Sequence, residues 1–239
     1  MERLNAAMAP APVRPVKVLQ FGEGNFLRAF VDYMIDIANE KSDFNGSVAL
    51  VKPIQMGTLF PAFKEQDYRY TVMLRGLVDG QAVEQTRIVL DKTDEFSLCP
   101  PKSYPGKLTK FLFERAEAFD YAQDKGLIIL PVELIDDNGI MLKKCVKTLA
   151  KQWALGEKFE QWLETACVFT STLVDRIVTG YPRGEDQAIW EKLGYQDNLL
   201  DTAEPFGLWV IEGPAWIEDE LPFKKAGCNV VFTQDVSPY

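Results

Sequence analysis

The sequence predicts an α/β protein with a doubly wound, mainly parallel sheet and one antiparallel hairpin insertion. A strand-like segment, a helical segment and a second strand-like segment follow one another near the N-terminus, over residues 16–52. This strand–helix–strand order is typical of a parallel sheet with crossover helices. Strands and helices alternate again after residue 103. Between these regions, Asp79-Gly80 separates two alternating segments, which predicts a tight hairpin turn.

The composition of the chain excludes some classes of binding partner. The chain has 239 residues, of which 47% are hydrophobic and 26% are charged, as in an ordinary globular protein. Its net charge of −9 disfavours nucleic acid and anionic membranes as partners, although a local basic group or a helix terminus can still bind an anionic substrate. No apolar run approaches the ~20 residues of a membrane span, and no signal peptide is recognisable, so we expect a cytoplasmic protein.

Metal binding is not expected. Metal-binding sites of the zinc type need clustered cysteine or histidine ligands. The chain has no histidine, and its four cysteines are scattered without a CxxC spacing. We therefore expect reduced thiols, which suits a cytoplasmic location.

The N-terminal elements follow from local patterns. Residues 1–15 are rich in alanine and proline and are expected to form a flexible lead-in, with residues 16–239 forming the domain itself. Residues 16–21 are an apolar strand candidate. From Asn25 the apolar residues recur at spacings of three and four, which predicts a helix. Residues 47–52 form the next buried strand candidate.

The later elements continue the alternation. The hairpin strands are predicted at residues 68–75 and 82–89. Further helices are predicted at residues 105–121, 139–153 and 157–166, and further strands at residues 126–132, 208–212 and 229–233. Trp209 and Trp216 lie in apolar surroundings at strand spacing and are expected in the core.

The turn between the first strand and the first helix contains Gly22 and Gly24. In a dinucleotide-binding fold the first glycine allows the tight turn, and the second lets the backbone approach a pyrophosphate at the helix N-terminus. Leu27 occupies the place of the usual third glycine, so the turn alone fits dinucleotide binding and an ordinary βα turn about equally well. The choice between NAD and NADP stays open: Lys52 would favour a 2′-phosphate, whereas Gln55 would suit free ribose hydroxyls.

Several longer motifs resemble the mannitol dehydrogenase family of polyol-specific long-chain dehydrogenases. They are QFGEGNFLRAF at 20–30, KSYPGKLT at 102–109, PVELID at 131–136, STLVDRI at 171–177 and TAEPF at 202–206. The string at 170–183 is most similar to the branch of the family that interconverts D-tagaturonate and D-altronate in hexuronate catabolism. The resemblance extends from about residue 16 to the end of the chain.

The resemblance implies a Rossmann-like domain with NAD as cofactor, a sugar-acid substrate and no metal. The family's phosphate-binding turn corresponds to Gly22, Gly24, Asn25 and Phe26, and Arg28 matches the arginine of the same motif. A fructuronate-type or mannitol-type activity of the same family is the nearest alternative. A non-catalytic binding domain, which self-associates through an exposed domain interface, is the alternative from a different class.

Two departures from the family pattern affect the expected activity. The family's general-base lysine, and the asparagine and histidine that assist it, lie beyond Tyr239, so the resemblance implies a cofactor-binding part without competent chemistry. The family also carries a strand and a polar loop after the hairpin. Here residues 89–98 lead directly into residues 99–102, which predicts that one central strand is missing.

Three residues are candidates for positions close to the substrate. Glu133 follows an apolar strand, where α/β sheets open onto their ligand crevice. Asn138 could line the same crevice or simply belong to a turn before a helix. Ser171 stands where the mannitol branch carries an oxyanion-binding asparagine. Asp175 and Arg176 could form a functional pair near the cofactor or serve a structural role.

Overall fold

The computed structural model describes residues 1–51, 59–90 and 103–239. The chain divides into two compact units, each built from three separate segments. Unit 1 comprises Met1–Phe96, Asp175–Gly207 and Glu220–Asn229, and unit 2 comprises Ser97–Val174, Leu208–Asp219 and Val230–Tyr239. Two predictions lie outside the described residues. One concerns the choice of cofactor at Lys52 and Gln55, and the other concerns the missing central strand after residue 90.

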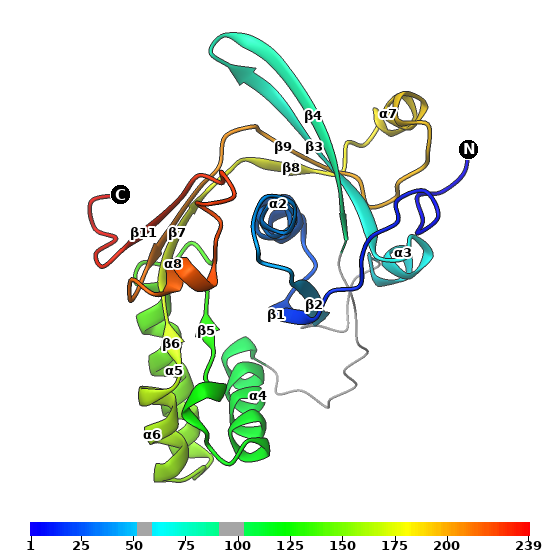
Figure 1. Ribbon diagram of the computed structural model, residues 1–239. Coiled ribbons are helices and arrows are strands. Elements are labelled where there is room, and N and C mark those ends of the chain that lie inside the picture. The colour runs from blue at the N-terminus through cyan, green and yellow to red at the C-terminus, as the bar shows by residue number, and fades with distance from the viewer. Residues whose placement is uncertain (52–58, 91–102) are drawn as a thin grey trace. The chain divides into compact units, whose positions relative to one another are not determined.

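The elements of unit 1 are β1 (Val16–Phe21), α1 (Asn25–Leu27), the π-helical turn η1 (Arg28–Asp32), α2 (Tyr33–Lys41), β2 (Ser47–Val51), α3 (Leu59–Glu65), β3 (Arg69–Val78), β4 (Gln81–Leu90), β8 (Val178–Gly180), α7 (Asp186–Leu193) and β9 (Asp201–Ala203) (Figure 1). Those of unit 2 are α4 (Tyr104–Ala118), the 3-10 turn η2 (Gln123–Lys125), β5 (Ile128–Ile129), α5 (Asn138–Gln152), α6 (Glu157–Thr165), β6 (Val168–Phe169), β7 (Ser171–Asp175), β10 (Leu208–Glu212), α8 (Ile217–Glu220) and β11 (Val230–Thr233).

The predicted strand–helix–strand unit is confirmed. β1 and β2 pair in parallel, with Leu19 opposite Ala49. The connection between them is helical from Asn25 to Lys41, through α1, η1 and α2. Its apolar face is buried at the predicted spacing, and Phe30 and Met34 are almost completely inaccessible.

The predicted hairpin is also confirmed. β3 and β4 pair in antiparallel register as far as Val78 opposite Gln81. Asp79 and Gly80 have φ values of +51° and +77°, as a two-residue type I′ turn requires. β3 pairs in parallel with β9 on its other side, and β9 pairs with β8. The sequence analysis did not predict β8 or β9, which are only three residues long.

Unit 2 contains its own hydrophobic core. Helices α4, α5 and α6 contact one another (Figure 1). They contribute the buried side chains Leu108, Leu112, Ala116, Leu142, Val146, Ala150, Phe159, Trp162 and Leu163. β5 pairs in parallel with β6 but is shorter than predicted. One reason is that Pro131, inside the predicted strand, has no N–H to continue the ladder.

The third sheet has the order β11-β10-β7, and β10 and β11 are parallel. Trp209 in β10 is 1% exposed, as the sequence predicts. The prediction for Trp216 was wrong, because 47% of this residue is exposed. Trp216 lies in the turn before α8 and not in a strand, so the spacing argument does not apply to it.

Part of the N-terminal segment is packed where the sequence predicts a flexible lead-in. Leu4 is fully buried, and its N–H donates to the Gln196 carbonyl at 2.9 Å. Farther along, Arg69 Nε donates to the Ala9 carbonyl at 2.6 Å. An apolar anchor and main-chain hydrogen bonds therefore hold a segment whose composition alone suggests disorder.

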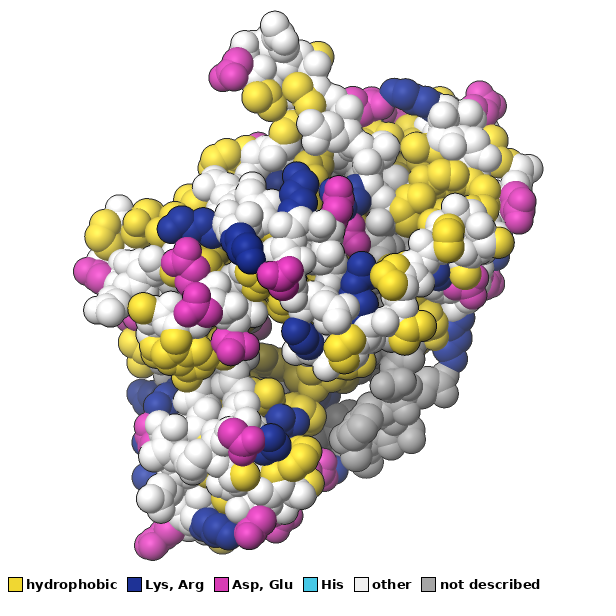
Figure 2. Space-filling model, in the orientation of Figure 1, with side chains coloured by type: hydrophobic (Ala, Val, Ile, Leu, Met, Phe, Trp, Pro, Cys, Tyr) yellow, Lys and Arg dark blue, Asp and Glu magenta, His cyan; other side chains and the backbone are white. Residues whose placement is uncertain are grey.

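Figure 2 shows acidic, basic and hydrophobic side chains mixed on one face of the molecule. None of the helices in the described part of the chain is long and apolar enough to cross a membrane.

Candidate functional site

The turn between β1 and α1 exposes the backbone of one glycine to solvent. Gly22 has a φ of +126°, a conformation that residues with a Cβ rarely adopt, and its N–H donates to the Val51 carbonyl at 2.9 Å. Gly24 is exposed, and a Cβ built on it would meet no atom within 4 Å. A ligand can therefore approach the backbone at Gly24 directly.

The helix that begins after Gly24 supplies the electrostatics of the turn. Gly24 is its N-cap, in an extended conformation, and its carbonyl accepts the Arg28 N–H at 3.2 Å. The first amides of a helix have no partner within the helix and carry the positive end of its dipole. An open glycine at this point fits an anionic group such as a diphosphate.

A buried ionic cluster lies beneath the turn. Arg28, Asp32 and Asp201 are each at most 1% exposed. Arg28 Nη2 lies 3.3 Å from Asp201 Oδ2. Asp32 Oδ2 accepts hydrogen bonds from Gln20 Nε2 and from the Tyr70 hydroxyl, both at 3.1 Å. The predicted cofactor residue Arg28 is thus brought to the turn, but its side chain lies inside the protein.

Burial perturbs both carboxylates of this cluster. Loss of solvent raises the pKa of Asp32 to about 7, although Gln20, Tyr70 and Arg28 oppose the shift. The same cause raises the pKa of Asp201 to about 6, against the attraction of Arg28. Carboxyl groups in such surroundings favour the neutral form, so the cluster changes charge close to neutral pH.

The sequence analysis did not single out Asp32, Asp201 or Gln20. A signal was present for the two acids, since Asp32 interrupts the apolar run around Phe30 and Met34, and Asp201 directly follows Leu199-Leu200. Charged residues are almost never fully buried unless they are paired. An acid on an apolar face therefore indicates a buried network.

Phe26 and Arg176, which belong to the family-like motifs, both make contacts within the protein. Phe26 stacks on Phe30, with ring centroids 5.0 Å apart. The Arg176 guanidinium donates to the carbonyls of Ala29 and Phe206, both at 2.8 Å. For Arg176 these contacts support the structural interpretation over the functional one.

The structure brings together the three candidate substrate residues within unit 2. Asn138 Nδ2 donates to the Glu133 carbonyl at 3.1 Å and to the Thr172 carbonyl at 2.9 Å. Asn138 Oδ1 accepts the Thr172 N–H at 2.9 Å. Asn138 and Ser171 are buried, whereas Glu133 is exposed. Asn138 thus ties the start of α5 to β7, and Glu133 is the candidate that faces solvent.

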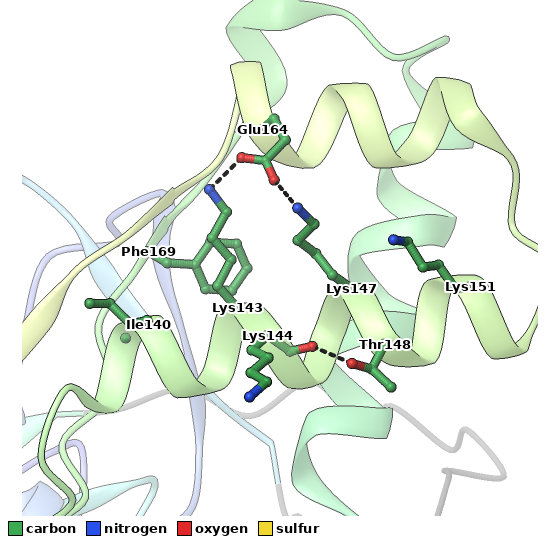
Figure 3. A pocket seen from close by; sticks show the side chains of 9 residues that line it. Ile140, Lys143, Lys144, Lys147, Thr148, Lys151, Glu164 and Phe169 are labelled. Atoms are coloured by element: carbon green, nitrogen blue, oxygen red, sulfur yellow. Dashed lines mark hydrogen bonds and ion pairs between the residues drawn. The ribbon is translucent and has the colours of Figure 1, made fainter.

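A basic groove runs along α5 in unit 2 (Figure 3). Its lining includes Lys143, Lys144, Lys147 and Lys151. Lys143 Nζ and Lys147 Nζ both bind Glu164, at 2.6 and 2.5 Å, so a carboxylate of the protein already neutralises part of this charge. The groove is open to solvent.

Within the described residues, no group of three or more histidine, cysteine, aspartate or glutamate side chains is placed to hold a metal ion. Cys145, Cys167 and Cys228 are free thiols. Burial raises the pKa of Cys167 and of Cys228 to about 11.

Comparison with known proteins identifies the family. Residues 16–225 match the family described as the mannitol dehydrogenase Rossmann domain. The chain belongs to this family. Its fold is accordingly Rossmann-like, with the parallel pairs β1-β2, β5-β6, β3-β9 and β10-β11 and the antiparallel hairpin β3-β4.

Two solved structures of similar fold support this description. A mannitol 2-dehydrogenase from Pseudomonas fluorescens, in a ternary complex with NAD and D-mannitol, superposes with a TM-score of 0.76 at 20% identity. The match covers 99% of this chain and 59% of that one. A D-sorbitol dehydrogenase in its substrate-free form gives a TM-score of 0.73 at 18% identity, covering 98% and 59%.

Curated relatives are closer in sequence. Altronate oxidoreductases of Cronobacter sakazakii and Escherichia coli are 42% and 43% identical to this mannitol dehydrogenase family member, over all of its length. The chain spans 57% of the length of each relative. The alignments extend over 278 and 279 residues against 239 in the chain, so the relatives carry residues that this chain lacks within the aligned region.

Proposed function

We propose that the chain is the dinucleotide-binding part of an NAD(H)-dependent oxidoreductase that interconverts D-tagaturonate and D-altronate. The observation that carries the proposal is the open backbone at Gly24, at the start of a helix and directly after a parallel strand. Membership of the family and the names of the curated relatives support the substrate pair. A cytoplasmic location belongs to the same proposal.

In this proposal the main-chain amides from Gly24 to Phe26 bind the diphosphate, and Gly22 provides the bend that exposes them. The bound nicotinamide would supply the hydride-transfer chemistry. Glu133 is the residue of unit 2 that we assign to contact with the substrate, because its side chain is exposed. We assign Asn138 and Ser171 to supporting the backbone around Glu133, since both are buried. The Asn138 side-chain amide donates to the Thr172 carbonyl and accepts from the Thr172 N–H.

Replacing Gly24 by valine tests the proposed cofactor site. The backbone of Gly24 is extended and the space around it is open, so we expect the free energy of unfolding to change by less than about 1 kcal/mol. The added side chain would stand where the diphosphate must approach. We expect the dissociation constant for NADH, measured by fluorescence titration, to rise by at least about tenfold.

The same titration decides between cofactors and tests the site itself. NADPH serves as the comparison ligand, because the sequence leaves the 2′-phosphate question open. Wild-type protein that binds neither dinucleotide would refute the proposed site. Equal affinity for NADH in the wild type and in Gly24→Val would place the binding elsewhere.

An exposed apolar segment favours self-association as a second candidate function. Leu134 and Ile135 are 89% and 58% exposed, and Ile140 and Met141 nearby are 58% and 46% exposed. Adjacent exposed apolar side chains of this size are common at association surfaces. We expect light scattering to give a concentration-dependent mass for the wild type and a monomer mass for Leu134→Ser/Ile135→Ser. A wild type that is monomeric at all concentrations would rule this candidate out.

A further inference from the structure

A loop directly before α5 exposes acidic and apolar side chains together. Residues 133–137, with the sequence Glu-Leu-Ile-Asp-Asp, are all exposed. Among the described residues, the side chains of Asp136 and Asp137 have no hydrogen-bond or ion-pair partner. This acidic loop therefore offers both negative charge and apolar surface to a partner.

The basic groove along α5 has the opposite charge and a similar apolar component. It has a volume of about 600 Å³, which is within the range of sites that enclose a ligand. Ile140 and Phe169 contribute apolar lining, and Ile140 is itself exposed. The groove can therefore receive a segment that is both acidic and apolar.

Two of the four lysines in the groove remain available for such a segment. Glu164 binds the other two. Lys144 points away from Glu164 (Figure 3) and has no ion-pair partner among the described residues. Lys151 comes only to 4.0 Å from Glu160, and a surface pair at this distance contributes little. The groove therefore keeps positive charge that the protein itself does not neutralise.

The acidic loop of the same copy cannot supply the missing negative charge along the whole groove. Asp137, Lys144 and Lys151 are spaced seven residues apart, which keeps side chains on nearly the same face of a helix. With a rise of ~1.5 Å per residue, Lys151 lies about 20 Å along the helix from Asp137. One face of α5 is thus acidic at its start and basic farther along. Such a face is complementary to a second copy of itself that runs antiparallel.

The charge of the whole chain also favours a second copy as the partner. The net charge is −9, so the groove is a basic surface on an acidic protein. In a two-fold arrangement both copies use the same surface, so every contact between loop and groove forms twice.

We propose that two copies of the chain associate around a two-fold axis through α5, with the acidic loop of each copy bound in the basic groove of the other. Leu134 and Ile135 pack against the apolar lining of the groove, and Asp136 and Asp137 pair with its available lysines. The inference rests on the second candidate function, self-association, because it names the surface that receives the exposed apolar segment.

Charge reversal on each side of the contact tests the proposal. Asp136→Lys/Asp137→Lys makes the loop basic, and Lys144→Glu/Lys151→Glu makes the groove acidic. Each variant alone brings like charges together, so we expect its dimer dissociation constant to rise at least about tenfold. In an equimolar mixture, the basic loop of the first variant meets the acidic groove of the second, and the acidic loop of the second meets the basic groove of the first. We expect the mixture to associate at least as strongly as the wild type, which also shows that both variants are folded.

Sedimentation velocity over a concentration series measures the association. The matched control is Asp43→Lys/Glu220→Lys, which makes the same change in net charge as the loop variant at two exposed acids outside the loop and the groove. This control should associate like the wild type. Because salt screens exposed charges, the wild-type dimer should be weaker at about 0.5 M than at about 0.05 M salt.

Failure of the inference can be told from failure of self-association. A wild type that is monomeric at all concentrations would overturn both. If Leu134→Ser/Ile135→Ser abolishes association while both charge variants associate like the wild type, self-association stands, but the basic groove is not the receiving surface. Charge variants that are monomeric alone and stay monomeric when mixed would also overturn the contact between loop and groove.

Discussion

Replacing Gly139 by alanine is expected to destabilise unit 2 by at least about 3 kcal/mol. A Cβ on Gly139 would lie 2.0 Å from the Thr170 carbonyl oxygen and 2.4 Å from its carbon. Thr170 cannot easily move away, because its N–H and its hydroxyl both donate to the Ile129 carbonyl, at 3.1 and 2.8 Å. Alanine is otherwise favourable in a helix, so the loss would come from this contact alone.

Urea unfolding, followed by circular dichroism, measures the effect. Gly24→Ala is the matched control, since a Cβ at Gly24 meets nothing within 4 Å. We expect this control to unfold at nearly the same urea concentration as the wild type. If Gly139→Ala also unfolds like the wild type, then the start of α5 does not pack against Thr170 as described.

The stability of the protein is expected to fall as the pH rises from about 5 to about 8. Asp32 has a pKa of about 7 in the folded chain against 3.8 as its ordinary value. Between these values the folded state binds more protons than the unfolded state, so each step up in pH favours unfolding. Asp201, with a pKa of about 6, contributes in the same direction. The loss should amount to roughly 2–4 kcal/mol across this range.

The variant Asp32→Asn isolates this effect. Asparagine keeps the shape of the side chain but does not ionise, so we expect a flatter dependence of the unfolding free energy on pH. Asp43→Asn is the control, because Asp43 is an exposed residue whose side chain binds Lys225. It should follow the wild-type curve. Parallel curves for the wild type and Asp32→Asn would show that Asp32 does not bind a proton in this range.

The sequence predicts well what is decided locally. Apolar spacing over residues 25–41 and the Asp79-Gly80 pair specify a helix and a hairpin through neighbouring residues alone, and both are present. The glycine turn is predictable for the same reason, since the steric freedom of Gly22 belongs to the residue itself.

The buried ionic cluster depends on contacts between distant segments, and sequence patterns do not reveal them. Arg28 and the Leu199 carbonyl that it binds are 171 positions apart. Asn138 shows the same limit: its sequence context suggests a turn or a crevice residue, but its amide is used by Thr172, 34 positions away. The strands β8 and β9 are too short to show a periodicity in the sequence: β9 pairs with β3, and β8 pairs with β9, so both depend on partners that are distant in the chain.

The division of the chain into two interleaved units has a consequence for how it can be dissected. The polypeptide passes from one unit to the other five times, after residues 96, 174, 207, 219 and 229. No single cut can separate the units, and a stop codon after Gly207 would remove β10 and β11 from the sheet that contains β7. A C-terminal truncation that extends past Asn229 therefore removes residues from both units. Circular permutants keep all six segments and can therefore move the chain ends without removing part of either unit.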